Sequence, residues 1–226
     1  FNCNWDRAIF QAIKLDKYEW VNYLVSKDKN LLQVRDYHDN TPLHIAAKMG
    51  NVKIINLLLK HGSNIEAINT MDHTPLFLAV RYGKQNAVEA LLKHGADFNK
   101  FDYVKYSPLQ YACINRSSDS EKLFFKLYNL QKSNKSTIEK QIQKCYETAI
   151  SHNNPFAYNY IKKTEIEMNF SVLPDIEIGI DMIPVLVNEK KSLEFLKKDL
   201  VIAIKDDCRE RIELYKRSGF YDILKP

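Results

Sequence analysis

A short sequence pattern recurs in this chain at a fixed interval. Residues 41–47 read TPLHIAA, residues 74–80 read TPLFLAV and residues 107–113 read SPLQYAC, so consecutive copies start 33 residues apart. A second pattern, LLKHG, ends at Gly62 and again at Gly95 with the same interval. Two independent patterns that share one period indicate tandem structural units, and such units bury their apolar faces by stacking on one another.

The residue types within each unit predict a pair of helices. Thr41 can cap the first helix through its hydroxyl, and Pro42 occupies the first helical position, where a missing N–H costs nothing. Leu43, Ala46 and Ala47 follow as an apolar stripe whose small members allow neighbouring helices to approach closely. A glycine then turns the chain into a second apolar helix, and the glycine of the LLKHG pattern ends that helix.

Residues 36–113 resemble the ankyrin repeat in these two motifs and in their period. The resemblance implies an all-α fold, an ankyrin-repeat solenoid of six to seven helix pairs with degenerate terminal repeats. Short β-hairpin loops, for example over residues 64–72 and 97–105, would connect the units. It also implies three parts of the chain: a degenerate N-terminal capping repeat (1–35), regular repeats (36–130), and degenerate ankyrin-like repeats with a C-terminal cap (131–226).

Two positions depart from the family pattern. The histidine of the first motif is kept only at His44, and Phe77 and Gln110 replace it in the next two units. We therefore expect the later units to be held more by packing than by the hydrogen bonds that this histidine makes. The hairpin glycine of the family is replaced in all three units, by Asp39, Asp72 and Lys105. Because lysine tolerates a positive φ less well than aspartate, we expect a distorted turn at Lys105.

Weaker copies of the pattern extend beyond this window. Residues 9–24 match a degenerate first unit, which predicts that Tyr18, Trp20 and Tyr23 point inward. An alternative for residues 131–226 is a separate small helical domain. On the repeat interpretation, we expect a helix at 121–130, a polar loop at 133–137, and further helix pairs over 146–161, 176–198 and 200–215.

Charge and composition argue against several classes of protein. The chain has 33 Lys and Arg against 28 Asp and Glu, a net charge of +5 spread evenly along it, which is unlike the concentrated basic face of a nucleic-acid binder. No apolar run reaches the roughly 18 residues that a membrane span needs. The cysteines lie far apart, which favours free thiols in a reducing compartment; they are Cys3, Cys113, Cys145 and Cys208.

Three groupings could suggest chemistry, and we interpret each as structural. Cys145 and His152 are seven residues apart and could share a helix face, but no third orienting group accompanies them. Residues 206–208, Asp-Asp-Cys, fall at an expected turn between helices. His61 and His94 are expected at helix ends one unit apart, too distant to share a metal ion. We therefore predict no enzymatic activity, no cofactor and no metal.

The resemblance also predicts where a partner would bind. In ankyrin repeats, contacts with partners come mostly from the hairpin tips and the first helix of each pair, which line the concave face. The corresponding positions here are rich in Tyr and Met, residue types that serve as interface anchors, although tyrosine is also frequent in the chain as a whole. The predicted partner-binding residues are Tyr37, His38, Asn40, Lys48, Met49, Thr70, Met71, His73, Arg81, Tyr82, Tyr103, Val104, Tyr106, Ile114 and Asn115.

We thus predict a monomeric, intracellular and cytoplasmic scaffold that binds another protein and neither nucleic acid nor membranes. The chain combines regular with degenerate repeats and is rich in Lys, Asn and Ile. In this it is similar to ankyrin effectors of intracellular bacteria and to poxvirus host-range ankyrin proteins. That similarity implies capture or diversion of a host protein in the host cytoplasm or nucleus. Three alternatives stay open: an adaptor whose C-terminal part docks to other machinery, a C-terminal part with cryptic enzymatic activity at Cys145 or Cys208, and binding of nucleic acid or an acidic membrane through the net charge of +5.

Overall fold

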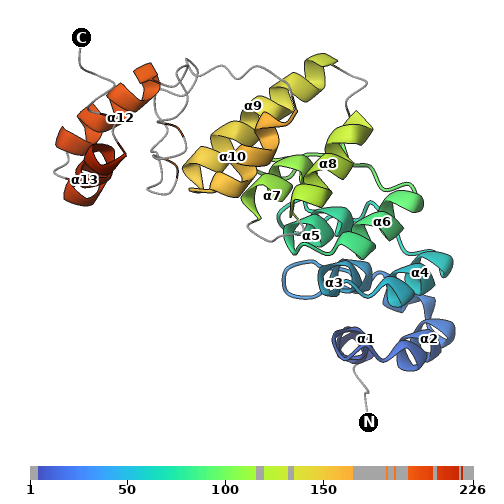
Figure 1. Cartoon of the computed structure of the whole chain (residues 1–226). Coiled ribbons are helices and arrows are strands. Elements are labelled where there is room, and N and C mark those ends of the chain that lie inside the picture. Colours follow the sequence, from blue (N-terminus) through green and yellow to red (C-terminus); the bar gives the residue numbers. More distant parts are fainter. Residues whose placement is uncertain are drawn as a thin grey trace. The chain divides into compact units, whose positions relative to one another are not determined.

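A computed structural model of the chain describes residues 5–115, 120–131, 135–164, 182, 186, 193–205, 208–218 and 220 (Figure 1). The regular elements of these residues are helices, and no strand occurs among them. The chain divides into two compact units, residues 1–127 and residues 128–226. The predicted all-α fold is confirmed, and six helix pairs fall within the described residues.

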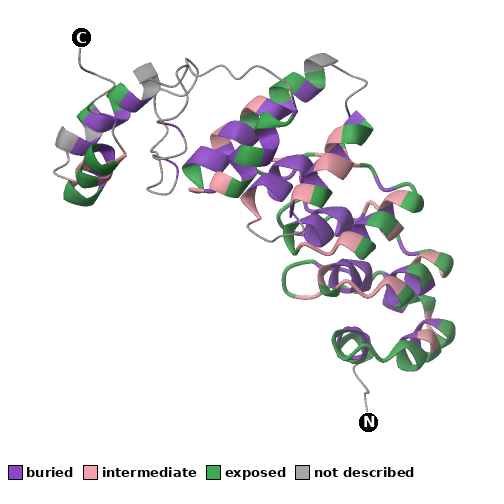
Figure 2. Ribbon diagram, in the orientation of Figure 1, coloured by how far each residue is buried: buried purple, intermediate pink, exposed green. Residues whose placement is uncertain are grey.

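The first compact unit, residues 1–127, is a two-layer stack of helix pairs. Consecutive first helices pack against one another, α1 on α3, α3 on α5 and α5 on α7, and the second helices follow with α2 on α4 and α4 on α6. Buried residues concentrate on α3, α5 and α7, in each of which most residues are buried (Figure 2). The elements are α1 (Trp5–Lys14), α2 (Tyr18–Lys27), the 3-10 helix η1 (Lys29–Leu32), α3 (Pro42–Met49), α4 (Val52–Lys60), α5 (Pro75–Arg81), α6 (Gln85–Lys93), α7 (Pro108–Ile114) and α8 (Ser120–Gln131), whose residues from 128 on belong to the second unit.

The second unit contains two further helix pairs, in each of which the two helices contact each other. The predicted polar loop at 133–137 is wrong in its second half, because residues 135–137 already belong to a helix; residues 133 and 134 lie outside the described residues. Of the helix pair expected over 176–198, only residues 182, 186 and 193–198 are described. The pairs are α9 (Lys135–Ser151) with α10 (Pro155–Lys162) and α12 (Leu193–Lys205) with α13 (Arg209–Arg217).

One kind of turn joins the helices of five pairs. The amide of the residue before the second helix donates to an alanine carbonyl five positions earlier, over 2.8–3.0 Å. The preceding residue has a positive φ in the four pairs where it is described: Asp16, Gly50, Gly83 and Asn153. These bonds satisfy carbonyls that a helix end leaves unpaired. The donor and acceptor pairs are Lys17 and Ala12, Asn51 and Ala46, Lys84 and Ala79, Asn154 and Ala149, and Cys208 and Ala203.

The cap of the first helix differs among the three regular units. The Thr41 hydroxyl and the His44 ring form a capping box, in which His44 Nδ1 accepts from the Thr41 amide over 3.1 Å. Gln110 forms the same box with Ser107, so this unit keeps the cap hydrogen bonds although it lacks the histidine. In the repeat that has Phe77 in place of the histidine, the Thr74 hydroxyl is buried and forms no hydrogen bond with a described residue. The absence of the histidine ring from this cap accounts for the difference.

The hairpins between units contain turns rather than strands. Asp39, Asp72 and Lys105 all adopt the left-handed conformation, with φ of 59°, 56° and 65°. The Lys105 amide donates to the Asp102 carbonyl over 3.0 Å, as the Asp72 amide does to the Asn69 carbonyl over 3.0 Å. The expected distortion at Lys105 is therefore wrong: the hairpin keeps its geometry, and the lysine itself carries the strain of a positive φ.

We expect Lys105→Gly to stabilise the chain by about 0.5–1 kcal/mol, because glycine removes the contact between Cβ and carbonyl that penalises a left-handed lysine. The free energy of unfolding in urea measures this change. Asp39→Gly is the control and should gain less, since aspartate tolerates this conformation. A loss of stability in Lys105→Gly would contradict the assignment of strain to this residue.

The buried His44 ring predicts a dependence of stability on pH. His44 is fully buried, its Nε2 lies 2.9 Å from the His73 carbonyl oxygen, and burial lowers its pKa to about 4. The unfolded chain, with a histidine pKa of 6.5, then binds more protons than the folded chain between these two values. Stability is therefore lost as pH falls from about 6.5 to about 4, by about 3 kcal/mol from this group.

We expect His44→Gln to remove this contribution, because Gln110 shows that glutamine can complete the same cap. At pH 7 the variant should be less stable than the native chain by about 1 kcal/mol, for the lost bond to the His73 carbonyl. Between pH 6.5 and pH 4.5 its stability should fall less steeply, which thermal melts across this range would measure. Parallel pH profiles for both chains would contradict the role assigned to His44.

Candidate interaction surface

Each hairpin of the first unit is closed by one polar side chain at the same repeat position. Asp36 Oδ1 accepts from the amides of His38 and Asn40, each over 2.9 Å. Asn69 Oδ1 plays the same part in the next hairpin, and Asp102 Oδ1 accepts from the Tyr106 amide over 2.7 Å. These side chains are 33 residues apart, so the repeat that builds the helices also shapes the hairpin tips.

Backbone bonds tie each hairpin tip to the next. The Thr70 amide donates to the His38 carbonyl over 3.1 Å, and the Tyr103 amide donates to the Met71 carbonyl over 3.1 Å. Arg35 adds a side-chain bond to the Ile68 carbonyl over 2.6 Å. Because their backbones are bonded across units, the three tips form a continuous row that holds its side chains at fixed spacing.

Most of the predicted partner-binding residues lie exposed along this row and at the adjoining ends of α3 and α5. Tyr37 and Tyr103 occupy the same repeat position and are 88% and 67% exposed. Lys48, Tyr106, Ile114 and Asn115 are half-buried. We call the exposed members the hairpin strip; they are Tyr37, His38, Met49, Thr70, Met71, Arg81, Tyr82, Tyr103 and Val104.

Cations lie against aromatic rings within and beside the hairpin strip. Lys48 Nζ lies 4.8 Å from the centroid of the Tyr82 ring, and the Arg81 guanidinium carbon lies 5.7 Å from that of Tyr111. Such contacts hold both partners in place through the ring quadrupole. Tyr82 is therefore an exposed aromatic with a restricted orientation, which lowers the entropy lost when it is buried by a partner.

Two predicted partner-binding residues are buried, and their assignment to the surface is wrong. Asn40 is 7% exposed and accepts a bond from Asn69 Nδ2 over 2.8 Å, while His73 is 1% exposed. They share one repeat position, directly before the helix cap, where the hairpin folds the side chain under the tip. Tyr106, the third residue at this position, is half-buried. This position supports the hairpin from below and is not available to a partner.

His73 belongs to a buried polar cluster beneath the third tip. Asp102 Oδ2 accepts from the Tyr111 hydroxyl over 2.6 Å, and His73 Nε2 lies 3.0 Å from that hydroxyl and 3.3 Å from Asp102 Oδ2. Burial lowers the pKa of His73 despite the nearby carboxylate, and burial raises the pKa of Tyr111. The cluster thus joins two units through neutral side chains around one carboxylate.

Sequence reasoning missed some features that the repeat could have revealed. The hairpin-closing residues recur at the 33-residue interval, as do Ile68 and Phe101, which are 47% and 46% exposed.

In the first helix pair, the predicted inward orientation of three aromatic residues is wrong: Tyr18, Trp20 and Tyr23 are 36%, 63% and 52% exposed. The residues at the corresponding positions of α4, Ile54 and Leu57, are buried, and α4 packs against both α2 and α6.

The structure also places the groups considered for chemistry. Cys145 is fully buried, whereas His152 is exposed, with Nδ1 3.1 Å from the Thr148 carbonyl oxygen. Cys208 caps α13, and residues 206 and 207 lie outside the described residues. Within the described part of the chain, no group of three or more potential metal ligands occurs, and no helix has the length and apolar character of a membrane span.

Comparison with known protein families gives matches within residues 2–136. A family model described as "Ankyrin repeats (3 copies)" matches residues 2–69 and again residues 66–136. The two matches together cover more than half of the 226-residue chain and include all of the hairpin strip. They extend through α8 into the second residue of α9.

We expect Tyr111→Phe to destabilise the chain by about 2 kcal/mol, because the buried Asp102 carboxylate loses its shortest hydrogen bond while the ring is retained. Urea unfolding would measure the change. Tyr103→Phe is the matched control, since that hydroxyl belongs to an exposed side chain and its loss should change stability little. Equal stability of both variants would show that the cluster does not support the tip.

Proposed function

Because the chain belongs to the ankyrin repeat family, whose repeats generally mediate contacts between proteins, we propose that it is a non-enzymatic scaffold that binds a partner protein through the hairpin strip. The observation that carries this proposal is the row of exposed Tyr and Met side chains on backbone-bonded tips. A surface that is ordered before binding loses little conformational entropy on association.

The chemistry of the hairpin strip favours a protein as the ligand. Tyrosine, methionine and arginine are the residue types enriched at protein interfaces, and the tyrosine rings bury a large area at a small rotamer cost. The strip spans three hairpins and two helix ends, so its contacts are distributed over a long surface. Such a surface suits a folded protein or an extended segment better than a small molecule, which needs an enclosed pocket.

A finer proposal concerns the biological setting. Regular repeats at residues 36–113, followed by helix pairs of weaker sequence similarity, in a chain rich in Lys, Asn and Ile support a role as an effector that captures or diverts a host protein. An adaptor function is a second candidate, favoured by the division into two compact units. An adaptor would hold two partners, one on each unit, whereas a simple binder would hold one.

The triple variant Tyr37→Ala, Tyr82→Ala and Tyr103→Ala should keep its thermal stability and lose most partner binding, because it removes three large exposed rings without touching the core. Affinity capture from a host-cell lysate, followed by titration of the captured protein, should show at least about a tenfold weaker affinity. The matched control is Trp20→Ala with Tyr23→Ala, which removes two exposed rings outside the strip.

Three outcomes separate the candidates. Loss of one captured protein with retention of a second supports the adaptor function. Loss of all specific capture supports a simple binder. Capture at native affinity by the triple variant, with loss in the Trp20 and Tyr23 control, would reject the hairpin strip as the binding surface.

A further inference from the structure

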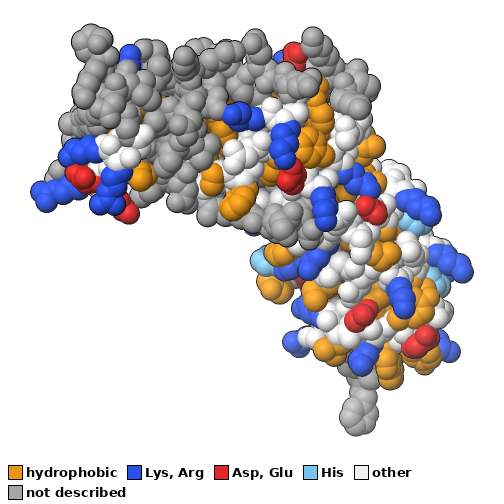
Figure 3. All heavy atoms as spheres, viewed as in Figure 1, with side chains coloured by type: hydrophobic (Ala, Val, Ile, Leu, Met, Phe, Trp, Pro, Cys, Tyr) orange, Lys and Arg blue, Asp and Glu red, His pale blue; other side chains and the backbone are white. Residues whose placement is uncertain are grey.

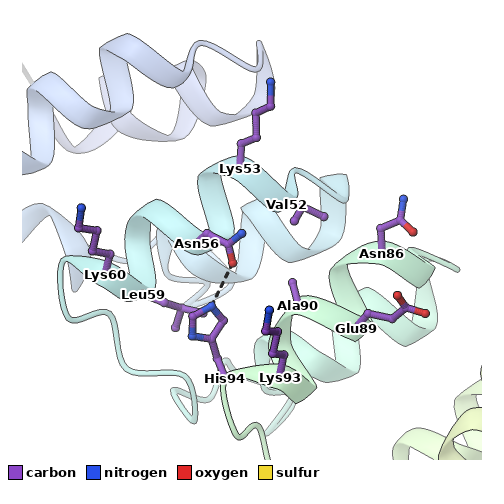
Figure 4. Close-up of a pocket in the computed structure, with 10 residues that line it drawn as sticks. All are labelled: Val52, Lys53, Asn56, Leu59, Lys60, Asn86, Glu89, Ala90, Lys93 and His94. Carbon is purple, nitrogen blue, oxygen red and sulfur yellow. Dashed lines mark hydrogen bonds between the residues drawn. The ribbon is translucent and has the colours of Figure 1, made fainter.

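An open groove lies on the other layer of the first unit, between the second helices α4 and α6. Figure 4 shows the residues that line it, and its volume is about 1020 Å³. The residues that line it come from these two helices and from His94, directly after α6, whereas the hairpin strip lies on the hairpins and the ends of α3 and α5. The groove is therefore a separate surface. Its floor and walls are formed by Val52, Lys53, Asn56, Leu59, Lys60, Asn86, Glu89, Ala90, Lys93 and His94.

One residue that lines the groove on α6 is smaller than its counterpart on α4. Ala90 takes the repeat position of Leu57. Leu57 is 6% exposed and packs within the stack, whereas Ala90 is half-buried and borders the groove. The smaller side chain leaves space on α6 that a leucine would fill.

The walls of the groove are regular stripes along the two helices. On α6 the lining residues fall at positions 86, 89, 90 and 93, and on α4 at positions 52, 53, 56, 59 and 60, both of which have helical spacing. His94 Nε2 lies 3.0 Å from Asn56 Oδ1, so a hydrogen bond joins the α6 end to the middle of α4 (Figure 4). The groove runs along both helices, and this bond links its two walls.

The floor is aliphatic and the rim is basic. Val52, Leu59 and Ala90 are half-buried and supply the apolar surface. Lys53, Lys60 and Lys93 are exposed, and none of them forms an ion pair with a residue that the structure describes. The single acidic residue of the lining, Glu89, is bonded to Lys126 over 2.8 Å. Basic side chains recur along the visible edge formed by these outer helices (Figure 3).

We propose that this groove binds a short amphipathic helix of a second partner protein, with aliphatic residues on one face and acidic residues on its flanks. The aliphatic face would fill the hollow left by Ala90, and the acidic flanks would meet lysines of the rim. Lys53 and Lys60 are seven residues apart, so their α carbons are separated by about 10 Å along α4, which matches carboxylates two turns apart on the bound helix. Helix-in-groove recognition uses this combination of apolar anchors and charged rim.

The lining favours a protein helix over a nucleic acid. Binding of single-stranded nucleic acid relies on aromatic side chains that stack on bases, and no aromatic residue other than His94 lines this groove. His94 is already bonded to Asn56. Lysines alone could hold phosphates, but the aliphatic floor would then contribute nothing.

The test measures binding of a fluorescein-labelled amphipathic helical peptide of about 15 residues, with leucine on one face and glutamate on both flanks, by fluorescence anisotropy. Ala90→Leu restores the residue type of the preceding unit and fills the hollow, so it should weaken binding at least about tenfold while thermal stability is kept. Lys60→Glu with Lys93→Glu should weaken binding by a similar factor, and added salt should no longer weaken it further, because two attractive contacts become repulsive.

Two controls make the outcome decisive. Lys14→Glu with Lys29→Glu makes the same change of charge at exposed sites outside the groove, and the hairpin-strip triple variant alters the other surface; both should bind the peptide like the native chain. A peptide with lysine in place of glutamate should not bind. Native affinity in Ala90→Leu would overturn the proposal. So would tighter binding of a single-stranded oligonucleotide that the lysine reversal abolishes and Ala90→Leu leaves unchanged, which would assign the rim to phosphate.

Discussion

A small buried residue in each helix pair is the constraint on which the rest of the structure depends. Ala46, Ala79 and Ala112 are fully buried at one repeat position, and their size lets consecutive first helices pack closely. In two of these pairs the same residue also accepts the bond of the inter-helix turn, and Ala149 and Ala203 do so in the second unit. In these two pairs the same alanine therefore sets how closely the first helices pack and accepts the hydrogen bond of the turn between the two helices.

The close packing of the first helices brings the hairpin tips within hydrogen-bonding distance. The bonds between His38 and Thr70 and between Met71 and Tyr103 follow from that spacing, and they turn separate loops into a continuous surface. Beneath the hairpin tips, buried polar residues join neighbouring repeats, and the hydrogen bonds differ from one repeat to the next. His44 reaches the next hairpin directly, whereas the unit with Phe77 relies on the cluster around Asp102.

The two layers of the first unit offer surfaces of different chemistry. The hairpin strip is aromatic and is proposed to bind one partner, whereas the groove between α4 and α6 is aliphatic with a basic rim. They can act independently because they lie on different helices. At one repeat position Ala90 of α6 stands where α4 has Leu57, and the smaller residue borders the second surface while the stack continues past it.

The sequence by itself determined the helix pairs, their period and their capping residues, because these depend on local spacing and on residues such as Pro42 and Gly50 whose preferences are intrinsic. It also located the tips that carry Tyr37 and Tyr103. Only the tertiary structure decided which polar residues are buried: Asn40 and His73 were expected at the surface, and contacts with the neighbouring hairpin place them beneath it. It likewise decided the orientation of Trp20 and the hollow at Ala90, because both depend on which helix packs alongside, and that contact joins residues far apart in the chain.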